Sequence, residues 1–177
     1  MCSEVIPAIR NMKDFDKVLN TDHQKIILLE TRLSQLESVV KHAKLKGKEV
    51  FIHADLVQGL KVDEYGLEYL IHNVKVDGII STRSSVITFA KKRKIVGIQR
   101  LFALDSVALD HNLKACQKIQ PDYIEVLPGV IPEILQEVKQ KTGIPVIAGG
   151  LIRTREDVDR ALAFGASVVT TSNTNLW

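Results

Sequence analysis

The regular alternation of short apolar runs with helical patterns constrains the fold of this chain more than any other feature. Seven segments with helical periodicity separate the apolar runs. The eight runs, each of four or five residues, are Val5–Ile9, Lys25–Leu29, Val50–Ala54, Gly78–Ser81, Ile95–Gln99, Tyr123–Leu127, Pro145–Ala148 and Ser167–Thr171. Strands interleaved with helices in this way form βαβ units and therefore a parallel sheet.

The helical segments carry one repeated apolar spacing, i, i+3, i+4 and i+7, which packs one helix face against a sheet. Residues that start or end helices mark their boundaries. The expected boundaries are capping boxes at Ser34 with Glu37 and at Thr154 with Asp157, Pro132 in a first turn, and left-handed glycines at Gly47, Gly143 and Gly165.

The number of strands selects the fold class. Eight strands favour a closed barrel over an open doubly wound sheet, which commonly has five or six. We predict an α/β fold, a compact (β/α)8 TIM-type barrel that forms a single domain over residues 1–177. Because such barrels typically need ~250 residues, we expect short loops and a last helix reduced to roughly one turn near Asn175–Trp177.

Composition narrows the setting of the protein. The chain is 45% hydrophobic and 25% charged, as in ordinary globular proteins. No apolar run approaches the ~20 residues of a membrane span, and no signal-peptide pattern is present. Cys2 and Cys116 have neither metal-ligand nor disulfide-framework spacing. We expect a cytoplasmic protein without a membrane partner. A net charge of +3 tolerates an anionic partner but does not demand one.

A glycine pair, Gly149–Gly150, follows the seventh apolar run, and Ser172–Asn173 follows the eighth. In phosphate-binding barrels, the loops after these two strands hold an anion with main-chain amides. A glycine pair alone is more often a tight turn, but its position at the seventh strand favours a ligand site. We therefore predict phosphate binding by Gly149, Gly150, Ser172 and Asn173, with help from Arg153 or Arg100.

Three carboxylates, Glu30, Asp55 and Glu125, lie at the ends of different strands. Converging carboxylates suit proton transfer, and they equally suit the binding of a polyol through its hydroxyl groups. No strand ends in a lysine placed for a Schiff base, and no nucleophile–histidine arrangement is evident. His53 with Asp55 lacks a second cluster to complete a metal site. We predict no catalytic residue, metal or cofactor.

The arginines concentrate where strands lead into helices. Six of the eight are in these positions: Arg10, Arg32, Arg83, Arg100, Arg153 and Arg155. The forked guanidinium group suits phosphate recognition, so Arg10, Arg32, Arg83 and Arg100 are the candidate RNA contacts. The lysines at helix C-termini are better explained by the helix dipole and solubility. Only Phe102 and Trp177 are candidates for stacking on bases.

Seven segments spread over the chain resemble one known family. They are VIPAIRN from Val5, HADLVQGL from His53, DGIISTR from Asp77, IQRLFALDS from Ile98, DYIEVLPGV from Asp122, IPVIAGGLI from Ile144 and TTSNTNLW from Thr170. Together they are similar to the glycerol-3-phosphate-responsive antiterminators of bacterial glycerol operons. The resemblance implies a (β/α)8-like fold, no enzymatic turnover, glycerol 3-phosphate as effector ligand, and binding of leader mRNA so that transcription passes a terminator.

The resemblance makes a ligand-switched RNA-binding regulator the leading hypothesis. Such a switch requires that RNA prefer the liganded form, because a ligand that binds both forms equally shifts nothing. The carboxylates Glu30, Asp55 or Glu125 would then meet the glycerol hydroxyls. The main alternative is a barrel enzyme, an isomerase or lyase acting on a small phosphorylated substrate. A third hypothesis is a phosphosugar-binding scaffold without a switch. A homo-oligomer is compatible with the sequence.

Overall fold

The computed structural model describes residues 4–177 and contains the predicted barrel. Its strands are β1 (Val5–Ile9), β2 (Lys25–Leu28), β4 (Glu49–His53), β6 (Gly78–Ser81), β7 (Val96–Phe102), β8 (Tyr123–Leu127), β9 (Val146–Gly149) and β10 (Ala166–Thr171). They close in the order β1-β10-β9-β8-β7-β6-β4-β2, with every neighbouring pair parallel. The predicted fold class is confirmed.

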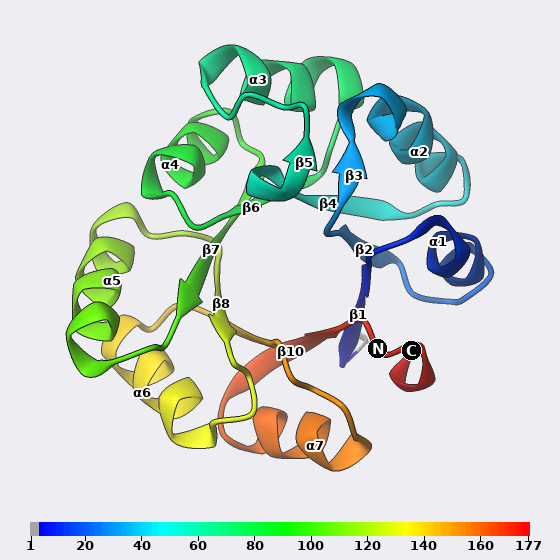
Figure 1. Cartoon of the computed structure of the whole chain (residues 1–177). Coiled ribbons are helices and arrows are strands. Elements are labelled where there is room, and N and C mark those ends of the chain that lie inside the picture. The colour runs from blue at the N-terminus through cyan, green and yellow to red at the C-terminus, as the bar shows by residue number, and fades with distance from the viewer. Residues whose placement is uncertain (1–3) are drawn as a thin grey trace.

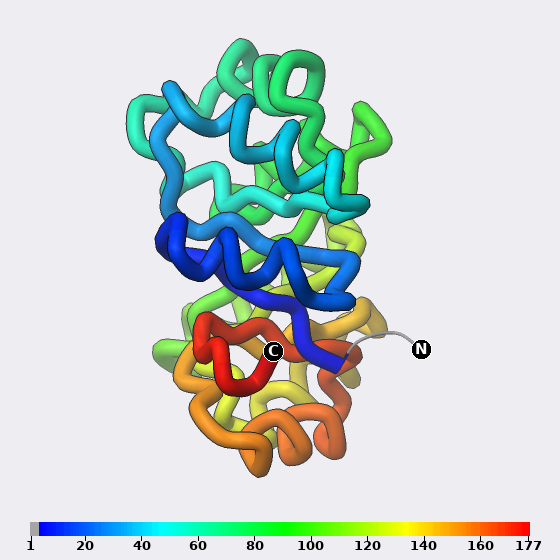
Figure 2. The backbone as a smooth tube through the Cα atoms, turned by 90° about the vertical axis from the view of Figure 1, so that its right-hand side faces the viewer, coloured from blue at the N-terminus to red at the C-terminus, as the bar shows by residue number. Residues whose placement is uncertain are grey.

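The helices surround the barrel (Figure 1). They are α1 (Met12–Leu19), α2 (Leu33–Leu45), α3 (Glu64–Tyr69) with the π-helical turn η2 (Leu70–Val74), α4 (Ser84–Lys92), α5 (Ser106–Ile119), α6 (Pro132–Thr142) and α7 (Arg155–Ala163). In place of an eighth helix, β10 leads into one 3-10 turn, η3 (Thr174–Leu176). Leu176 and Trp177 pack against the core, and the C-terminus lies near the start of β1 (Figure 2). The reduced last helix is thus confirmed.

Most predicted helix boundaries are confirmed. Thr154 and Asp157 form a reciprocal capping box, and Pro132 is in the first turn of α6. The three glycines have positive φ angles: Gly47 (+75°), Gly143 (+69°) and Gly165 (+107°). The capping box at Ser34 and Glu37 is wrong, because α2 begins at Leu33 with Arg32 as its N-cap.

A two-stranded parallel sheet explains that early start. Strand β3 (Thr31–Arg32) pairs with β5 (Val57–Gln58), and this pairing holds Arg32 in an extended conformation, so the helix starts directly after it. The 3-10 turn η1 (Ala54–Leu56) connects β4 to β5. This small sheet was not predicted, since two-residue strands leave no periodic signal. It ties together the connections that follow β2 and β4.

Three apolar clusters divide the core. Two lie between the barrel and its helices, and the third fills the barrel interior. The interior cluster draws one residue or more from every strand or its immediate end: Ala8, Ile27, Leu29, Phe51, Ile80, Ile98, Ile147 and Val168, with Ile6, Val96 and Tyr123 packed against them. Because side chains alternate between the two faces of a strand, the residues two positions further along face the same interior at the C-terminal mouth.

Candidate functional site

The alternation of side chains along each strand identifies the residues of the uppermost interior layer of the barrel. His53 lies two residues after Phe51, Arg100 after Ile98, Glu125 after Tyr123, Gly149 after Ile147 and Thr170 after Val168. An apolar layer therefore lies directly below a layer of polar and small residues. In barrels of this type, the C-terminal mouth is the face that binds ligands. This layer is the floor of the candidate site.

A buried ion pair crosses part of this floor. Arg100 Nε donates to Glu125 Oε2 at 2.7 Å, and the two side chains are 10% and 3% exposed. Thr170 Oγ1 donates to the other carboxylate oxygen, Glu125 Oε1, at 2.9 Å. The pair joins adjacent residues of β7 and β8, where Arg100 is in register with Glu125. Both oxygens of Glu125 are therefore engaged by the protein itself.

Gly149 leaves room for this network. A Cβ atom at Gly149 would lie 2.7 Å from Thr170 Oγ1 and 2.9 Å from Glu125 Oε1. These distances are shorter than real Cβ contacts allow, so the hydrogen bond between Thr170 and Glu125 requires a glycine at this position. The structure thus gives Gly149 a role in packing beside its predicted role in phosphate binding.

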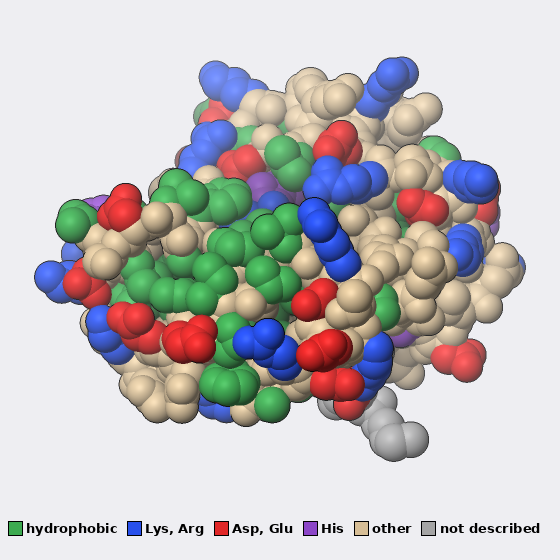
Figure 3. Space-filling model, turned by 60° about the horizontal axis from the view of Figure 1, so that its bottom comes forward, with side chains coloured by type: hydrophobic (Ala, Val, Ile, Leu, Met, Phe, Trp, Pro, Cys, Tyr) green, Lys and Arg blue, Asp and Glu red, His purple; other side chains and the backbone are tan. Residues whose placement is uncertain are grey.

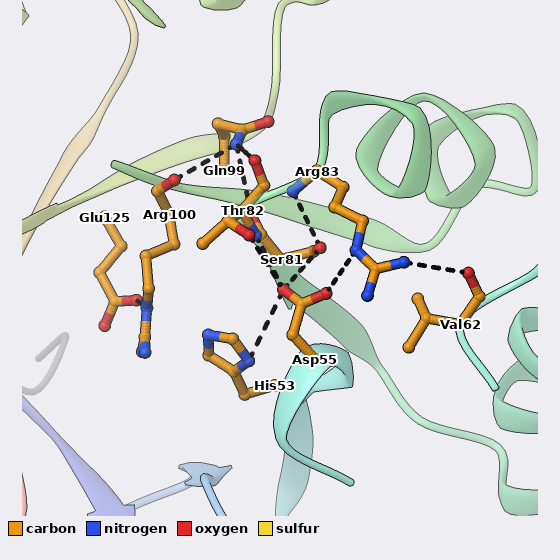
Figure 4. Close-up of polar contacts among 9 residues, drawn as sticks. All are labelled: His53, Asp55, Val62, Ser81, Thr82, Arg83, Gln99, Arg100 and Glu125. Atoms are coloured by element: carbon orange, nitrogen blue, oxygen red, sulfur yellow. Dashed lines mark hydrogen bonds and ion pairs between the residues drawn. The ribbon is translucent and has the colours of Figure 1, made fainter. Parts of the chain in front are cut away.

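Asp55 fastens the turn η1 to the end of β6. Its Oδ2 accepts hydrogen bonds from Ser81 Oγ at 2.8 Å and from the amide of Thr82 at 2.9 Å. On the other side, Arg83 Nε lies 3.2 Å from Asp55 Oδ1 (Figure 4). Sequence reasoning had not paired these residues, which are 26 to 28 positions apart. The assignment of Asp55 to the glycerol hydroxyls stays a prediction.

His53 differs from its neighbours because no protein group satisfies it. The side chain is 3% exposed, yet neither ring nitrogen has a hydrogen-bond partner within residues 4–177. The nearest carboxylate oxygen, Asp55 Oδ2, is 4.0 Å from Nδ1. Burial and the positive charge of Arg100 lower the pKa of His53 to about 4, against the opposing influence of Asp55 and Glu125. The imidazole is therefore neutral at pH 7.

The two predicted phosphate-binding loops follow β9 and β10. Two of their amides are occupied, because Arg153 N donates to Asp157 Oδ2 and Asn173 N to Thr171 Oγ1. By contrast, the amide of Ser172 donates to no residue in the described part of the chain. Asn173 Nδ2 also donates to the carbonyl of Arg153 at 2.8 Å, which joins the two loops. Phosphate binding at these loops stays a prediction.

Glu30 lies apart from the other two carboxylates. It forms an exposed ion pair with Arg10, at 2.7 Å, and both line a surface hollow of about 290 Å³ together with Arg32. A larger open hollow, of about 990 Å³, also borders Arg32 and extends to Lys61. The small sheet β3–β5 contributes to both. Neither hollow is lined by the loops after β9 and β10, so the structure separates Glu30 from the predicted phosphate site.

The rim arginines divide into two groups. The side chains of Arg10 and Arg83 are 56% and 54% exposed, and Arg32 is also exposed. Their contact with RNA stays a prediction. Arg100 was placed with them because the apolar run was expected to end at Gln99. The structure corrects the end of the strand: β7 continues to Phe102, and Arg100 points inward to Glu125 with 10% of its side chain exposed, so it does not belong to the exposed arginines of the rim.

The aromatic candidates also differ. Phe102 is 43% exposed, whereas Trp177 is half-buried and its Nε1 donates to the carbonyl of Thr171 at 2.9 Å. Trp177 therefore supports the last turn, and it is not a free stacking platform. Phe102 belongs to a set of exposed apolar side chains at or just beyond the C-terminal ends of β7, β8 and β9, namely Phe102, Leu104, Val107, Ile131 and Leu151.

A broad area of hydrophobic side chains, bordered by charged ones, is visible on one face of the molecule (Figure 3). Exposed apolar areas of this kind mark contacts with other molecules. A homo-oligomer stays a prediction.

Residues 4–177 contain no group of three or more His, Cys, Asp or Glu side chains arranged to hold a metal ion. Cys116 is buried, and burial raises the pKa of its thiol to about 11, so it is not nucleophilic at neutral pH. Cys2 lies outside the described residues. In the described chain, the helices are too short and too polar to cross a bilayer.

Fold and site together define the class of the protein: a small, all-parallel (β/α)8 barrel with a polar C-terminal mouth. Comparison with known proteins then identifies its family. The chain belongs to the glycerol-3-phosphate responsive antiterminators, whose family model matches residues 5–177.

Two solved structures and one further relative are similar over nearly the whole chain. A glycerol uptake operon antiterminator regulatory protein from Listeria monocytogenes str. 4b F2365 is 50% identical, with a TM-score of 0.97 over 100% of this chain and 96% of that one. An antiterminator-related protein from Thermotoga maritima MSB8 is 30% identical, with a TM-score of 0.88 over 100% and 99%. The uncharacterized protein YgcP of Escherichia coli (strain K12) is 34% identical over 98% of this chain and 91% of its own length.

Barrel enzymes share the fold at much lower identity. Deoxyribose phosphate aldolase from Aeropyrum pernix is 15% identical, with a TM-score of 0.77 over 97% of this chain and 86% of that one. Similarity at this level concerns architecture alone, because one barrel supports many unrelated activities. It carries no argument about catalysis.

Proposed function

We propose that this protein is a glycerol-3-phosphate-responsive transcription antiterminator, which binds leader mRNA of glycerol operons when its ligand is bound. Membership of the antiterminator family over residues 5–177 is the observation that carries the proposal. The relative that is 50% identical over the whole chain, itself an antiterminator regulatory protein, supports it. We infer a regulator without turnover, working in the cytoplasm.

In this proposal the phosphate is held at the loops after β9 and β10. The amide of Ser172 has no internal acceptor among the described residues, and an anion supplies one. Arg153 is exposed in the loop after β9 and can add a charged hydrogen bond. The hydrogen bond from Asn173 to the Arg153 carbonyl joins the loops, so one ligand can influence both. Gly149 and Asn173 then shape the site more than they donate to it.

The exposed arginines Arg10, Arg32 and Arg83 are the proposed RNA contacts. They follow β1, β2 and β6, so they share one end of the barrel with the ligand loops. Their charge is partly offset, since Arg10 pairs with Glu30 and Arg83 with Asp55. RNA phosphates would have to compete with these carboxylates, and a modest affinity that depends steeply on salt is therefore expected.

The proposal is tested by titrating labelled glycerol-operon leader RNA with the protein, with and without glycerol 3-phosphate. The expected result is tighter RNA binding with ligand, and a ligand affinity that increases by the same factor when RNA is present. Inorganic phosphate serves as the control for a simple salt effect. Equal RNA affinity in both conditions would refute the switch and leave a scaffold that binds phosphosugars.

The enzyme alternative is tested with the same protein. Glycerol 3-phosphate or a triose phosphate is incubated with it and followed by NMR. The proposal expects the spectra to remain unchanged, and the appearance of an isomerised or cleaved product would contradict it.

A further inference from the structure

The unsatisfied imidazole of His53 is the starting point of the inference. Buried polar groups in proteins are almost always hydrogen-bonded, because an unpartnered one costs free energy. His53 is 3% exposed, yet neither of its ring nitrogens has a partner in the described chain. It faces the barrel interior, two residues beyond Phe51, in the layer that borders the mouth. A buried side chain without an internal partner can form hydrogen bonds with a group that comes from outside the protein.

The groups around His53 are already committed to one another. Figure 4 shows the ring between Asp55 on one side and the Arg100–Glu125 pair on the other. Asp55 accepts hydrogen bonds from Ser81 and Thr82, and Glu125 accepts from Arg100 and Thr170. Neither carboxylate is within hydrogen-bond distance of the ring, since Asp55 Oδ2 lies at 4.0 Å and no contact joins Glu125 to it. Among these described side chains, Asp55 and Gln99 each leave one oxygen without a hydrogen-bond partner, whereas His53 leaves both of its polar atoms without one.

Glu125 connects this layer to the proposed phosphate loops. Its carboxylate accepts a hydrogen bond from Thr170 and lies next to Gly149. Thr170 and Gly149 are the last residues of β10 and β9 that face the barrel interior. A small ligand anchored by the amides that follow these strands would extend across the layer toward β4. Its end opposite the phosphate would then meet His53.

We propose that His53 is a specificity-determining residue that binds the uncharged, hydroxyl-bearing end of the ligand. This inference rests on the proposed function, and it assigns to His53 the contact that sequence reasoning had given to Glu30, Asp55 or Glu125. A neutral imidazole has one donor and one acceptor, and a hydroxyl group matches both. The ligand class is a phosphomonoester whose other end is a polyol.

The charges of the layer exclude a second anionic group. Arg100 is the only cation in contact with Glu125 among the described side chains, and that carboxylate already neutralises it. A ligand carboxylate at this point would face Glu125 and Asp55, with no free cation to balance it. Glycerol 3-phosphate should therefore be preferred to 3-phosphoglycerate, in which a carboxylate replaces the terminal hydroxymethyl group.

The experiment compares the affinities of glycerol 3-phosphate, 3-phosphoglycerate and propyl phosphate, which has no free hydroxyl, by calorimetry with the full chain. The variants are His53→Leu and His53→Gln, and the matched control is His72→Leu, on the exposed surface of η2. The wild type is expected to prefer glycerol 3-phosphate to propyl phosphate at least about tenfold. His53→Leu should lose this preference, His53→Gln should keep part of it, and the control should keep all of it.

Two further readouts separate recognition from a structural role. Without ligand, His53→Leu should resist urea at pH 7 as well as the wild type or better, because it removes an unsatisfied buried group. The imidazole nitrogen resonances of His53 should shift when glycerol 3-phosphate is added, and not when propyl phosphate is added. Lower stability of His53→Leu, with equal losses of affinity for both esters, would indicate a structural role and overturn the inference.

Failure of the inference is distinguishable from failure of the proposed function. If the wild type binds both esters equally, or His53→Leu retains the preference for glycerol 3-phosphate, the assignment of His53 is wrong and the phosphate site stands. If the wild type binds no phosphate ester, both fail together.

Discussion

The two sides of the barrel mouth present different kinds of polar group. Along β4, β6, β7 and β8, charged side chains are paired with one another, as in Arg100–Glu125 and Asp55–Arg83. After β9 and β10, the candidate binding groups are main-chain amides, and that of Ser172 has no acceptor in the described chain. The side-chain half is therefore held by internal contacts, whereas the main-chain half has an amide, at Ser172, that can donate to an anion without breaking an internal hydrogen bond.

This comparison predicts opposite consequences of mutation. Changes in the paired groups of the side-chain half, such as Arg100 and Glu125, should affect folding first, because each satisfies a buried partner. The unpartnered His53 is the exception. Changes in the main-chain half should affect ligand binding first, with a smaller effect on stability. The following experiments test that division, from the largest expected effect to the smallest.

Glu125→Gln should be the most destabilising change. It leaves the guanidinium of Arg100, only 10% exposed, without its counter-charge. Breaking a buried ion pair on one side costs about 3–5 kcal/mol, measured as the free energy of unfolding in urea. The double variant Arg100→Met/Glu125→Leu should recover most of this loss. If Glu125→Gln is no more destabilising than Glu137→Gln, which alters an exposed pair with Lys141, the buried pair contributes no such coupling.

Acid should destabilise the protein through His53. Its pKa is about 4 in the folded protein, against an ordinary value of 6.5, so the unfolded chain binds the proton first as pH falls. Stability should decline between pH 6.5 and 4 by about 3 kcal/mol from this residue, and the contribution should level off below pH 4. Arg100 opposes protonation, while Asp55 and Glu125 favour it. In His53→Leu this part of the pH dependence should disappear, and an unchanged profile would contradict the assignment.

Gly150→Ala tests the main-chain half. Gly150 has a φ of +76°, where a side chain costs about 1–2 kcal/mol, and the new Cβ would lie 3.2 Å from Leu127 Cδ2. The strained φ and this close contact together favour a shift of the loop, so affinity for glycerol 3-phosphate should fall at least about tenfold. Gly47→Ala is the matched control, because its φ is +75° and its Cβ would meet nothing within 4 Å. Equal ligand affinity in both variants would place the phosphate elsewhere.

Arg10→Ala should have the smallest effect on folding, since its pair with Glu30 is exposed and such pairs contribute little. Its expected effect is on RNA. Losing one phosphate contact to single-stranded RNA should lower the slope of log affinity against log salt by about 0.7. Arg160→Ala, on the exposed surface of α7, is the control. A slope that stays the same in Arg10→Ala would remove Arg10 from the RNA-binding surface.

Local pattern was sufficient to predict most of the fold. Each strand alternates with an amphipathic helix, and this local regularity fixed the number and order of the elements. Prediction failed where long-range contacts decide a boundary. Arg100 was expected just outside the strand because the apolar run ends at Gln99, and its inward position is stabilised by Glu125, 25 residues later. Similarly, pairing between β3 and β5 moved the start of α2.

The site was less predictable than the fold, for a related reason. The glycine pair at the end of β9 is a local signal, and its position was correctly placed at the seventh barrel strand. The state of His53 depends instead on which side chains from β7 and β8 surround it. Strand parity could have indicated that His53 and Arg100 face inward, but not that Glu125 and Asp55 would be satisfied by other groups.

The glycine between Glu125 and Thr170 has a consequence for how the sequence can vary. Since a methyl group at position 149 would occupy the space of the Thr170 hydroxyl, Gly149→Ala alone should be rejected in a selection for stable protein. Combined with Thr170→Ala, it should be better tolerated than the sum of the two single changes indicates. Positions 125, 149 and 170 are thus expected to evolve as a unit, each restricting which residues the others can accept.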